Sequence, residues 1–238
     1  MISDGALSQD EIEALLKGSD EAFGGTETAS DGNVDKQLFN EAAKIIADNQ
    51  AFSLSSISTK TVTITNIATT IGNTTNLQQM LSGKMVEAKV SYTGSISGNA
   101  YYFMGEKESL AISSFMMGQK EEILNDMVAQ ALKEAFSQMI GSSDSALTSR
   151  FGGNFTNSPV ETSILEDAST INISGSLAIV NGTATIEGEF ENAPYVLAME
   201  LPLLQALIGN SKSSRGNSAS NSNSGDSNNN EFEPSNQL

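Results

Sequence analysis

The sequence predicts an α+β domain built from a duplicated unit. Phe39–Lys44 aligns with Leu132–Ser137, and Asn99–Met104 aligns with Asn192–Leu197, both at one offset (134 − 41 = 93 and 192 − 99 = 93). Two separate matches at a single offset indicate an internal duplication. Segments with helical spacing of apolar residues also alternate with segments in which apolar and polar residues alternate, which is typical of helices and strands in one mixed domain.

The first unit is expected to open with a helix that starts at Asp35 and ends within residues 53–58, because the apolar residues between 38 and 46 keep helical spacing. Val62 and Ile64 alternate with threonines and predict a strand. The rest of the unit is expected to contain a short helix over 78–81, strands over 86–92 and 100–104 joined by a turn over 95–99, and a helix over 107–117 that ends at Gly118.

The second unit is expected to repeat this order with a longer helix over about 121–140. A polar turn follows, and then strands over 160–164, 171–180, 184–190 and 195–199 and a closing helix over 201–208. Pro202 falls in the first turn of that helix, where its missing N–H group is tolerated.

The N-terminal segment, residues 1–17, predicts a short amphipathic helix. Ser8 and Glu11 have the spacing of a capping box, and Leu7 and Ile12 have the spacing of a hydrophobic staple. Ile12, Leu15 and Leu16 fall on one face of this helix. A helix this short is marginal in water by itself, so we expect it to become stable when its leucine face docks on a partner.

Composition predicts where the folded domain begins and ends. Residues 18–34 are rich in Gly, Ser, Thr and acidic residues and predict a flexible linker, and residues 35–209 form the domain, with repeats over about 35–118 and 119–209. Residues 210–238 are rich in Ser and Asn and predict a disordered linker or tail, because they offer too little apolar surface to bury.

Charge and composition exclude several classes of function. The chain has 29 acidic and 12 basic residues, a net charge of −17 that disfavours nucleic acid and anionic lipid as partners. It has no cysteine and no histidine, which excludes thiol nucleophiles, Ser-His-Asp triads and the usual zinc sites. No apolar run approaches the roughly 18 residues of a membrane span. We therefore expect no metal, no cofactor, no nucleic-acid binding and no direct membrane insertion.

The segment Leu7–Leu16, with the sequence LSQDEIEALL, resembles the N-terminal segment of the flagellar motor switch proteins FliM and FliY. In those proteins this segment binds the phosphorylated response regulator CheY. The resemblance implies that phosphorylated CheY is bound here by Leu7, Ser8, Glu11, Ile12, Leu15 and Leu16. The alternative is an ordinary amphipathic helix that packs on its own domain.

The segment Glu134–Ser143, with the sequence EAFSQMIGSS, resembles the second repeat of the CheC/CheX/FliY phosphatase family. The resemblance covers residues 1–209. It implies a pseudo-twofold, duplicated CheC-like domain in which two long helices pack on a β-sheet, here with disordered N- and C-terminal segments. It also implies flagellar switch proteins of the FliM, FliN and FliG type as partners and a cytoplasmic location at the flagellar basal body, in the switch complex or C-ring.

The active pattern of that family is Asp or Ser, three residues, Glu, two residues, Asn, twenty-one residues, Pro. The second repeat has Gln130, Glu134, Ser137 and Pro159 at these positions, so the spacing is kept and the asparagine is replaced. In the family, Glu and Asn share one helix face, where one contacts the active-site lysine of the regulator and the other orients the attacking water. A serine hydroxyl is shorter than an amide, so the resemblance implies a degenerate catalytic site at Glu134 and Ser137.

The first repeat matches the pattern less well, with Gln37, Glu41, Lys44 and Asn66 at the four positions. The resemblance implies a doubtful catalytic role for Glu41 and no hydrolysis at this site, because lysine offers only donors. A shifted alignment would place Asn49 near the asparagine position. The alternative for Glu41 and Lys44 is an ordinary surface pair, and the alternative for Glu134 and Ser137 is a solvated glutamate beside a small residue.

Three functions are consistent with these observations. The leading one is a flagellar switch and chemotaxis protein that binds phosphorylated CheY and carries a degenerate CheC-like domain. The second is an active phosphatase for phosphorylated CheY, in which Ser137 or Asn49 replaces the asparagine. The third is a cell-surface β protein rich in Ser, Thr and Asn, which the capping box at Ser8 and Glu11 and the acidic N-terminus disfavour.

Overall fold

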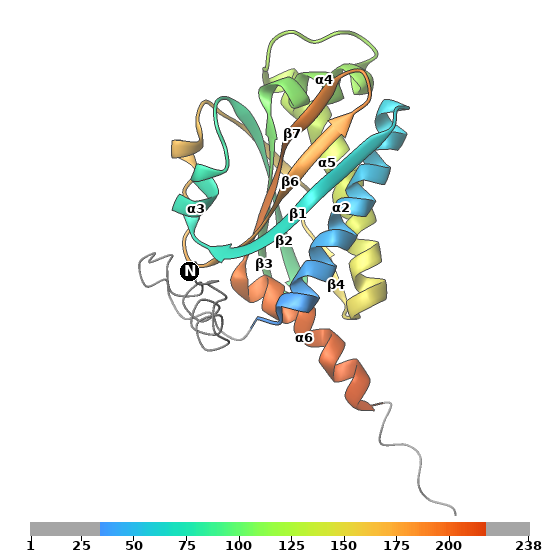
Figure 1. The fold of residues 1–238 in the computed structure, drawn as a ribbon, viewed down its shortest axis with the longest axis vertical. Helices are drawn as coiled ribbons and strands as arrows, with labels where there is room; N and C mark the ends of the chain where they lie inside the picture. The colour runs from blue at the N-terminus through green and yellow to red at the C-terminus, as the bar shows by residue number, and fades with distance from the viewer. Residues whose placement is uncertain (1–33, 218–238) are drawn as a thin grey trace, which may run out of the picture. The chain divides into compact units, whose positions relative to one another are not determined.

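The computed structural model describes residues 34–217. Helices and strands alternate in two series, each of which opens with a long helix and closes with a shorter one (Figure 1). In chain order the elements are α2 (Lys36–Ser58), β1 (Val62–Gly72), α3 (Thr74–Gln79), β2 (Met85–Gly94), β3 (Gly98–Gly105), α4 (Glu106–Met117), α5 (Asp126–Phe151), β4 (Phe155–Asn157), β5 (Glu161–Leu165), the 3-10 turn η1 (Ala168–Thr170), β6 (Leu177–Ile186), β7 (Phe190–Glu200) and α6 (Leu201–Asn217).

The duplication predicted from the sequence extends through the whole element order. Helix α2 corresponds to α5, α3 to η1, the hairpin β2–β3 to β6–β7, and α4 to α6. Adding 93 to the bounds of β1 gives 155–165, which is the span that β4 and β5 occupy together. The second repeat therefore breaks its first strand in two, and the break contains Pro159.

All strands form one antiparallel sheet with the order β1-β6-β7-β3-β2-β4, and β5 also pairs with β2. The order is symmetric about the contact between β7 and β3. The opening strand of each repeat pairs with the hairpin of the other, because β1 pairs with β6 while β4 and β5 pair with β2. Neither repeat can complete its part of the sheet alone, so the two form one domain about a pseudo-twofold axis.

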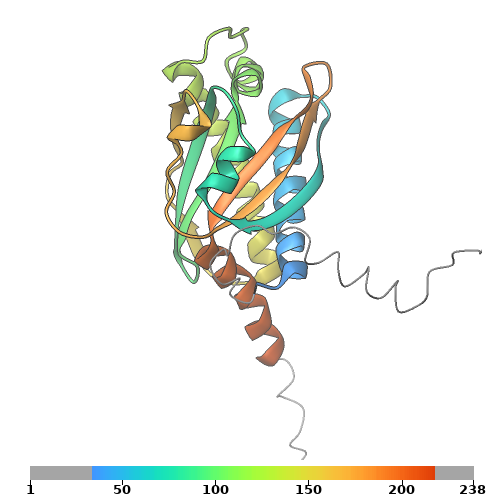
Figure 2. The same cartoon turned by 60° about the vertical axis from the view of Figure 1, so that its left-hand side comes forward.

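The two long helices lie side by side on one face of the sheet, and α3 lies on the other (Figures 1 and 2). Helices α2 and α5 are antiparallel, since Glu41 near the start of α2 contacts Arg150 near the end of α5. Strand β3 is buried on both faces: Tyr102 packs under the long helices, whereas Tyr101 and Phe103 pack against α3 and η1. This double burial accounts for the nearly continuous apolar run in the strand.

The helix predicted over 121–140 is wrong at both ends, because α5 begins at Asp126 and continues to Phe151. The side chain of Asn125 accepts hydrogen bonds from the first turn and caps the helix. The expected polar turn after residue 140 is helical, and its serines satisfy their own hydroxyl groups: Ser143, Ser145 and Ser149 each donate to the carbonyl oxygen four residues earlier, at 2.9 Å. A serine-rich composition therefore concealed a continuous helix.

The strands predicted over 171–180 and 184–190 are also wrong in their bounds, because a single strand, β6, runs without a break from Leu177 to Ile186 and so joins the end of the first to the start of the second. Asn181 and Gly182, which fall between the two predicted strands, lie within β6, opposite an irregularity in β1 between Thr65 and Ala68. A Cβ atom on Gly182 would lie 2.7 Å from the carbonyl oxygen of Thr65, so the glycine permits a close approach of two strands.

The structure tests the predicted end of the last helix but not the predictions for the two terminal segments. Helix α6 continues to Asn217, beyond the expected end at Ile208. The predicted helix over 1–17, the linker over 18–34 except for Val34, and the tail from 218 onward lie outside the described residues, so these boundaries stay predictions. None of the helices within 34–217 combines the length and the apolar character that a membrane crossing requires.

Candidate functional site

Glu134 lies on the outer, solvent-exposed face of α5. Leu132, Ala135 and Phe136 are buried and hold this part of α5 against the sheet, which turns Glu134 away from the core. Its Oε1 atom accepts a hydrogen bond from Nε2 of Gln138, one turn later, at 3.1 Å. Within the part of the chain that the structure describes, Glu134 forms no ion pair, so its carboxylate can receive a cation from a partner.

Ser137 lies one turn after Glu134 and is half-buried. Its hydroxyl group donates to the carbonyl oxygen of Lys133 at 2.7 Å. The single hydroxyl proton is therefore used inside the helix, and the oxygen can only accept a hydrogen bond from a water molecule. An asparagine in this place would offer both a carbonyl oxygen and an NH₂ group.

The segment that carries Pro159 runs along α5 in the opposite direction. Asn157 donates to Asp144 near the C-terminal half of α5, at 2.7 Å, and Thr162 donates to the carbonyl oxygen of Ala129 near its N-terminus, at 3.0 Å. Glu134 and Ser137 lie between these two anchor points on the helix, and Pro159 lies between them on the strand segment. The structure therefore brings the sequence-predicted residues of the second repeat into one region, with Gln130 exposed on the same helix.

In the first repeat, Glu41 is bound to an arginine. Arg150 donates through Nε to Oε1 of Glu41 at 2.5 Å and through Nη2 to Oε2 at 2.7 Å, a bidentate arrangement. This contact raises the pKa of Arg150, chiefly through the hydrogen bonds to Glu41. The residue that corresponds to Arg150 near Glu134 is Ile57 (150 − 93 = 57), which explains why only one of the two glutamates has a cationic partner.

The other first-repeat positions also depart from the pattern. Lys44 extends into solvent and pairs with Asp48 at 3.0 Å. Asn66 takes the place of the proline, but its φ angle is +54°, in the left-handed region. Proline is locked near −65° and could not adopt this conformation. The backbone of the first repeat is therefore built for a different residue at this point.

Asn49, the alternative for the catalytic asparagine, is occupied within the helical layer. Its Nδ2 atom donates to the carbonyl oxygen of Ile45 at 2.8 Å, and its Oδ1 atom accepts from Ser142 of α5 at 3.4 Å. Asn49 and Ser142 are equivalent residues of the two repeats (142 − 49 = 93), so this contact lies at the pseudo-twofold axis. Both ends of the amide serve helix packing and are not directed at a water molecule outside.

The sequence and the structure were compared with known proteins. No protein-family model matches the sequence. The sequence is 25% identical over 167 residues to the flagellar motor switch phosphatase FliY of Bacillus subtilis (strain 168), and the match covers 67% of this chain and 44% of FliY. The structure is similar to the crystal structure of FliY from Thermotoga maritima, with a TM-score of 0.66 and 22% identity over 79% of this chain and 99% of that chain. These similarities of sequence and fold support a relationship to the FliY/CheC/CheX family.

Other solved structures share the fold at lower identity. FliM in the FliG–FliM complex from H. pylori has a TM-score of 0.57 and 11% identity, covering 74% of this chain and 100% of that chain. The chemotaxis protein CheX from Vibrio vulnificus has a TM-score of 0.52 and 15% identity, covering 67% and 97%. The chain spans less than half the length of the Bacillus FliY that it matches.

Sequence reasoning missed one polar group of this domain, Asp144. Its Oδ1 atom accepts from the hydroxyl group of Tyr92 at 2.9 Å and its Oδ2 atom accepts from Asn157 at 2.7 Å. Burial raises the pKa of Asp144 to about 6, although both hydrogen bonds act to lower it. The signal was present in the sequence, since Asp144 lies seven residues after Ser137, but the helix was expected to end at residue 140.

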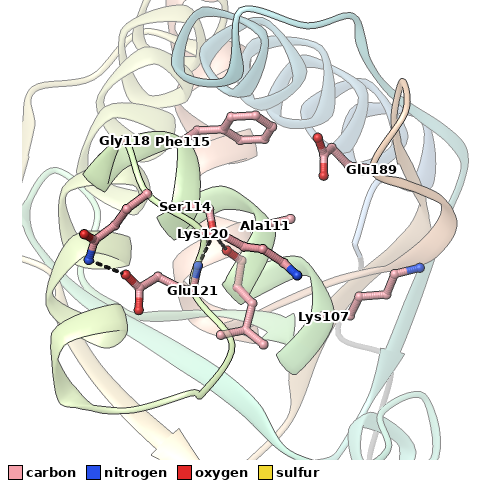
Figure 3. Close-up of a pocket in the computed structure, with 10 residues that line it drawn as sticks. Lys107, Ala111, Ser114, Phe115, Gly118, Lys120, Glu121 and Glu189 are labelled. Carbon is pink, nitrogen blue, oxygen red and sulfur yellow. Dashed lines mark hydrogen bonds between the residues drawn. The ribbon is translucent and has the colours of Figure 1, made fainter.

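The large open pocket of the domain lies away from Glu134. It has a volume of about 660 Å³ and is formed by α4, the loop after it and the turn between β6 and β7, so that Lys107, Phe115, Lys120 and Glu189 surround it (Figure 3). Glu134 and Ser137 do not line it. Within residues 34–217, no cluster of three or more acidic side chains is placed to hold a metal ion.

Proposed function

We propose that this protein is a flagellar motor switch and chemotaxis protein that binds phosphorylated CheY and hydrolyses its aspartyl phosphate weakly, at one degenerate site. The observation that carries the proposal is the contrast between the two glutamates. Glu134 is exposed and has no cationic partner among the described residues, whereas Glu41 is held by Arg150. A carboxylate that is free to bind a lysine of the regulator is thus present in the second repeat.

The expected weakness of hydrolysis follows from Ser137. A protein accelerates phosphoryl transfer mainly by positioning the attacking water and by stabilising charge. The hydroxyl proton of Ser137 is committed to Lys133 within the helix. It can therefore accept one hydrogen bond from a water molecule but cannot hold it from two sides, as an amide can. We infer that binding is the main activity and hydrolysis the minor one.

An active phosphatase is the second candidate, and one observation favours it. The oxygen of Ser137 keeps its acceptor lone pairs after donating to Lys133, and Pro159 keeps its spacing of 22 residues (159 − 137 = 22). A water molecule held by this oxygen beside Glu134 would give a working, if unusual, arrangement. The two candidates differ in rate and not in the residues involved.

We further propose that the N-terminal segment captures phosphorylated CheY through Leu7, Ser8, Glu11, Ile12, Leu15 and Leu16. The support is the sequence pattern of a capped amphipathic helix and the family to which the domain is similar. We also propose the switch proteins FliM, FliN and FliG as partners and a cytoplasmic position at the flagellar basal body, in the switch complex. FliM, which shares the fold, has been solved in a complex with FliG.

Phosphate release from phosphorylated CheY, measured with and without the full chain, tests the proposal together with a binding titration of a peptide that spans residues 1–17. Binding with slight acceleration supports the degenerate site. Strong acceleration that is lost with Glu134→Ala favours the active phosphatase. Neither binding nor acceleration would reject both.

The role of the N-terminal segment has its own test. Replacing Leu15 and Leu16 with alanine is expected to abolish binding of phosphorylated CheY to that segment, because two of its three apolar anchors are lost. Glu13→Ala, in the same segment but outside the predicted binding residues, is the matched control and should bind normally. The unfolding temperature of the domain should not change in either variant, and a large decrease with the leucine variant would show instead that the segment packs on the domain.

A further inference from the structure

The carboxyl group of Asp144 joins helix α5 to two strands. One oxygen binds Tyr92 of β2 and the other binds Asn157 of β4. Both bonds are within normal hydrogen-bond length, at 2.9 and 2.7 Å, and both are charge-assisted when the carboxyl group is ionised. The side chain of Asp144 therefore acts as a bracket between the helix that carries Glu134 and the strand that leads to Pro159.

The bracket lies at one end of the proposed site. Strand β4 is only three residues long and ends at Asn157, two residues before Pro159. On the far side of Pro159, Thr162 binds the carbonyl oxygen of Ala129. With Asp144 and Thr162 in place, the strand segment is tied to α5 at both ends, and the stretch of α5 between the ties contains Glu134 and Ser137.

The first repeat has no such bracket. The positions that correspond to Asp144 and Asn157 are occupied by Ala51 and Ile64 (144 − 93 = 51 and 157 − 93 = 64). Its opening strand, β1, is continuous over 11 residues and is held by its pairing with β6. Thr69, the equivalent of Thr162 (162 − 93 = 69), donates to Asn40 of α2, so the first repeat keeps a tie to its helix at that position and lacks one at the position of Asp144. The bracket therefore occurs in the repeat with the free glutamate and the proline.

We propose that Asp144 is a positioning residue, which holds β4 against α5 and thereby fixes Pro159 beside Glu134 and Ser137. The inference rests on the proposed function, because it assigns Asp144 to the site that would act on phosphorylated CheY. Asp144 does not touch the regulator or the reacting atoms. It acts through Asn157 on the geometry of the segment that passes the site.

The environment of Asp144 makes the bracket sensitive to pH. Tyr92 faces it from β2 and Asn157 faces it from β4, and Tyr102 of β3 is near enough for the charge of Asp144 to raise the pKa of that tyrosine. The described residues that line the small cavity at this point, about 20 Å³, include Ile46 of α2 and Leu203 of α6 and carry no charge apart from Asp144. A proton gained near pH 6 converts the carboxylate into a weaker acceptor, so the bracket loosens as the pH falls.

Hydrogen exchange of the backbone amides of residues 155–158 in the full chain tests the bracket directly. Asp144→Asn places an NH₂ group or a single oxygen where two acceptors are needed, and Asn157→Ala removes the exposed partner with little risk to folding. Each variant is expected to speed exchange in β4 about tenfold, the factor that corresponds to one charge-assisted hydrogen bond. Asp48→Asn, an exposed carboxylate on α2, is the matched control and should leave β4 unchanged.

Kinetics with phosphorylated CheY test whether the bracket serves the site. Asp144→Asn and Asn157→Ala are each expected to lower kcat for phosphate release about threefold with KM unchanged, since a small displacement of a site segment impairs chemistry more than binding. The double variant should lose no more than either single variant, because both remove the same bond. The wild-type rate should fall as the pH decreases through about 6, and this fall should be absent in Asp144→Asn.

These outcomes distinguish failure of the role proposed for Asp144 from failure of the proposed function. Unchanged exchange in β4 with both variants would overturn the bracket, whatever the activity. Faster exchange with unchanged kcat in the variants would overturn the positioning role while confirming the bond itself. If the wild-type chain neither binds nor dephosphorylates CheY, the proposed function fails, and the exchange result still decides whether Asp144 holds β4.

Discussion

The two repeats have the same order of elements, but the equivalent glutamates, Glu41 and Glu134, have different surroundings. In the first, Arg150 binds Glu41 in a bidentate pair across the two long helices. In the second, Ile57 stands where an arginine would be needed, and Glu134 remains exposed. The comparison shows that the duplication left one copy as part of helix packing and the other with a carboxylate available to a partner.

The strand that faces each glutamate differs in the same sense. The first repeat has a continuous β1 with Asn66 in a left-handed conformation that proline cannot adopt. The second has a strand broken at Pro159 and tied to α5 by Asp144, a contact without a counterpart at Ala51 in the first repeat. The tie from Thr162 to α5 does have a counterpart, because Thr69 donates to Asn40 of α2. The candidate site therefore differs from its pseudo-symmetric copy by several changes and not by one substitution.

Ser137→Asn is the sharpest way to use this comparison, because it would complete the family pattern in the second repeat only. The amide supplies the carbonyl and the donors that the serine lacks, and we expect the rate of phosphate release from phosphorylated CheY to rise about 100-fold. Ser145→Asn, at an exposed position on the same helix, is the matched control and should have no effect. An unchanged rate with Ser137→Asn would show that Gln130 or the position of Pro159 also limits the site.

Asp144 distinguishes the repeats through the pH dependence of stability. Its pKa is raised by burial from 3.8 to about 6, so the folded state holds a proton that the unfolded state releases. The stabilisation that comes from proton uptake by this buried carboxyl group is therefore fully present below about pH 4 and is lost as the pH rises through about 6, by roughly 3 kcal/mol, even though the hydrogen bonds to Tyr92 and Asn157 are stronger in the ionised form. Urea unfolding across this range should show that slope in the wild type and a flatter one in Asp144→Asn. Asp48→Asn should keep the wild-type slope, and a wild-type slope in Asp144→Asn would mean that another group titrates.

The duplication and the element types could be predicted from the sequence, because the repeat offset and the apolar spacing are local signals. The end of α5 could not, because Ser143, Ser145 and Ser149 resemble turn residues until their hydroxyl bonds to the helix backbone are seen. The continuity of β6 through Gly182 could not be predicted for a related reason, since that glycine permits a close approach to Thr65, a residue far away in the sequence.

Part of the candidate site could likewise be predicted from the sequence, and part of it could not. The spacing of Glu134, Ser137 and Pro159 was visible in the sequence, since two lie on one helix and the third follows at a fixed distance. The pairing of Glu41 with Arg150 was not visible, because it joins residues on different helices and depends on their antiparallel packing. Whether a glutamate is free is a tertiary property, and it is the reason we propose the second repeat as the site.

Replacing each glutamate with alanine tests whether the two repeats differ in function. Glu134→Ala is expected to lower phosphate release about tenfold, to the rate of CheY alone, because the weak site loses its contact with the regulator. Glu41→Ala should leave that rate unchanged and lower the unfolding temperature instead, since it leaves Arg150 without its partner. Equal losses of activity in both variants would contradict the assignment of a single site.

The smallest effect is expected for Lys44, which takes the place of the catalytic asparagine in the first repeat. Its contact with Asp48 is an exposed pair one helical turn apart, at 3.0 Å, and such pairs contribute about 0.3–0.5 kcal/mol. Lys44→Ala should therefore lower the free energy of unfolding by less than about 0.5 kcal/mol, and by less still in high salt, where screening weakens the pair. Phosphate release should not change. A decrease in phosphate release with Lys44→Ala would show that the first repeat contributes to the site through its positive charge, which the pairing of Glu41 with Arg150 argues against.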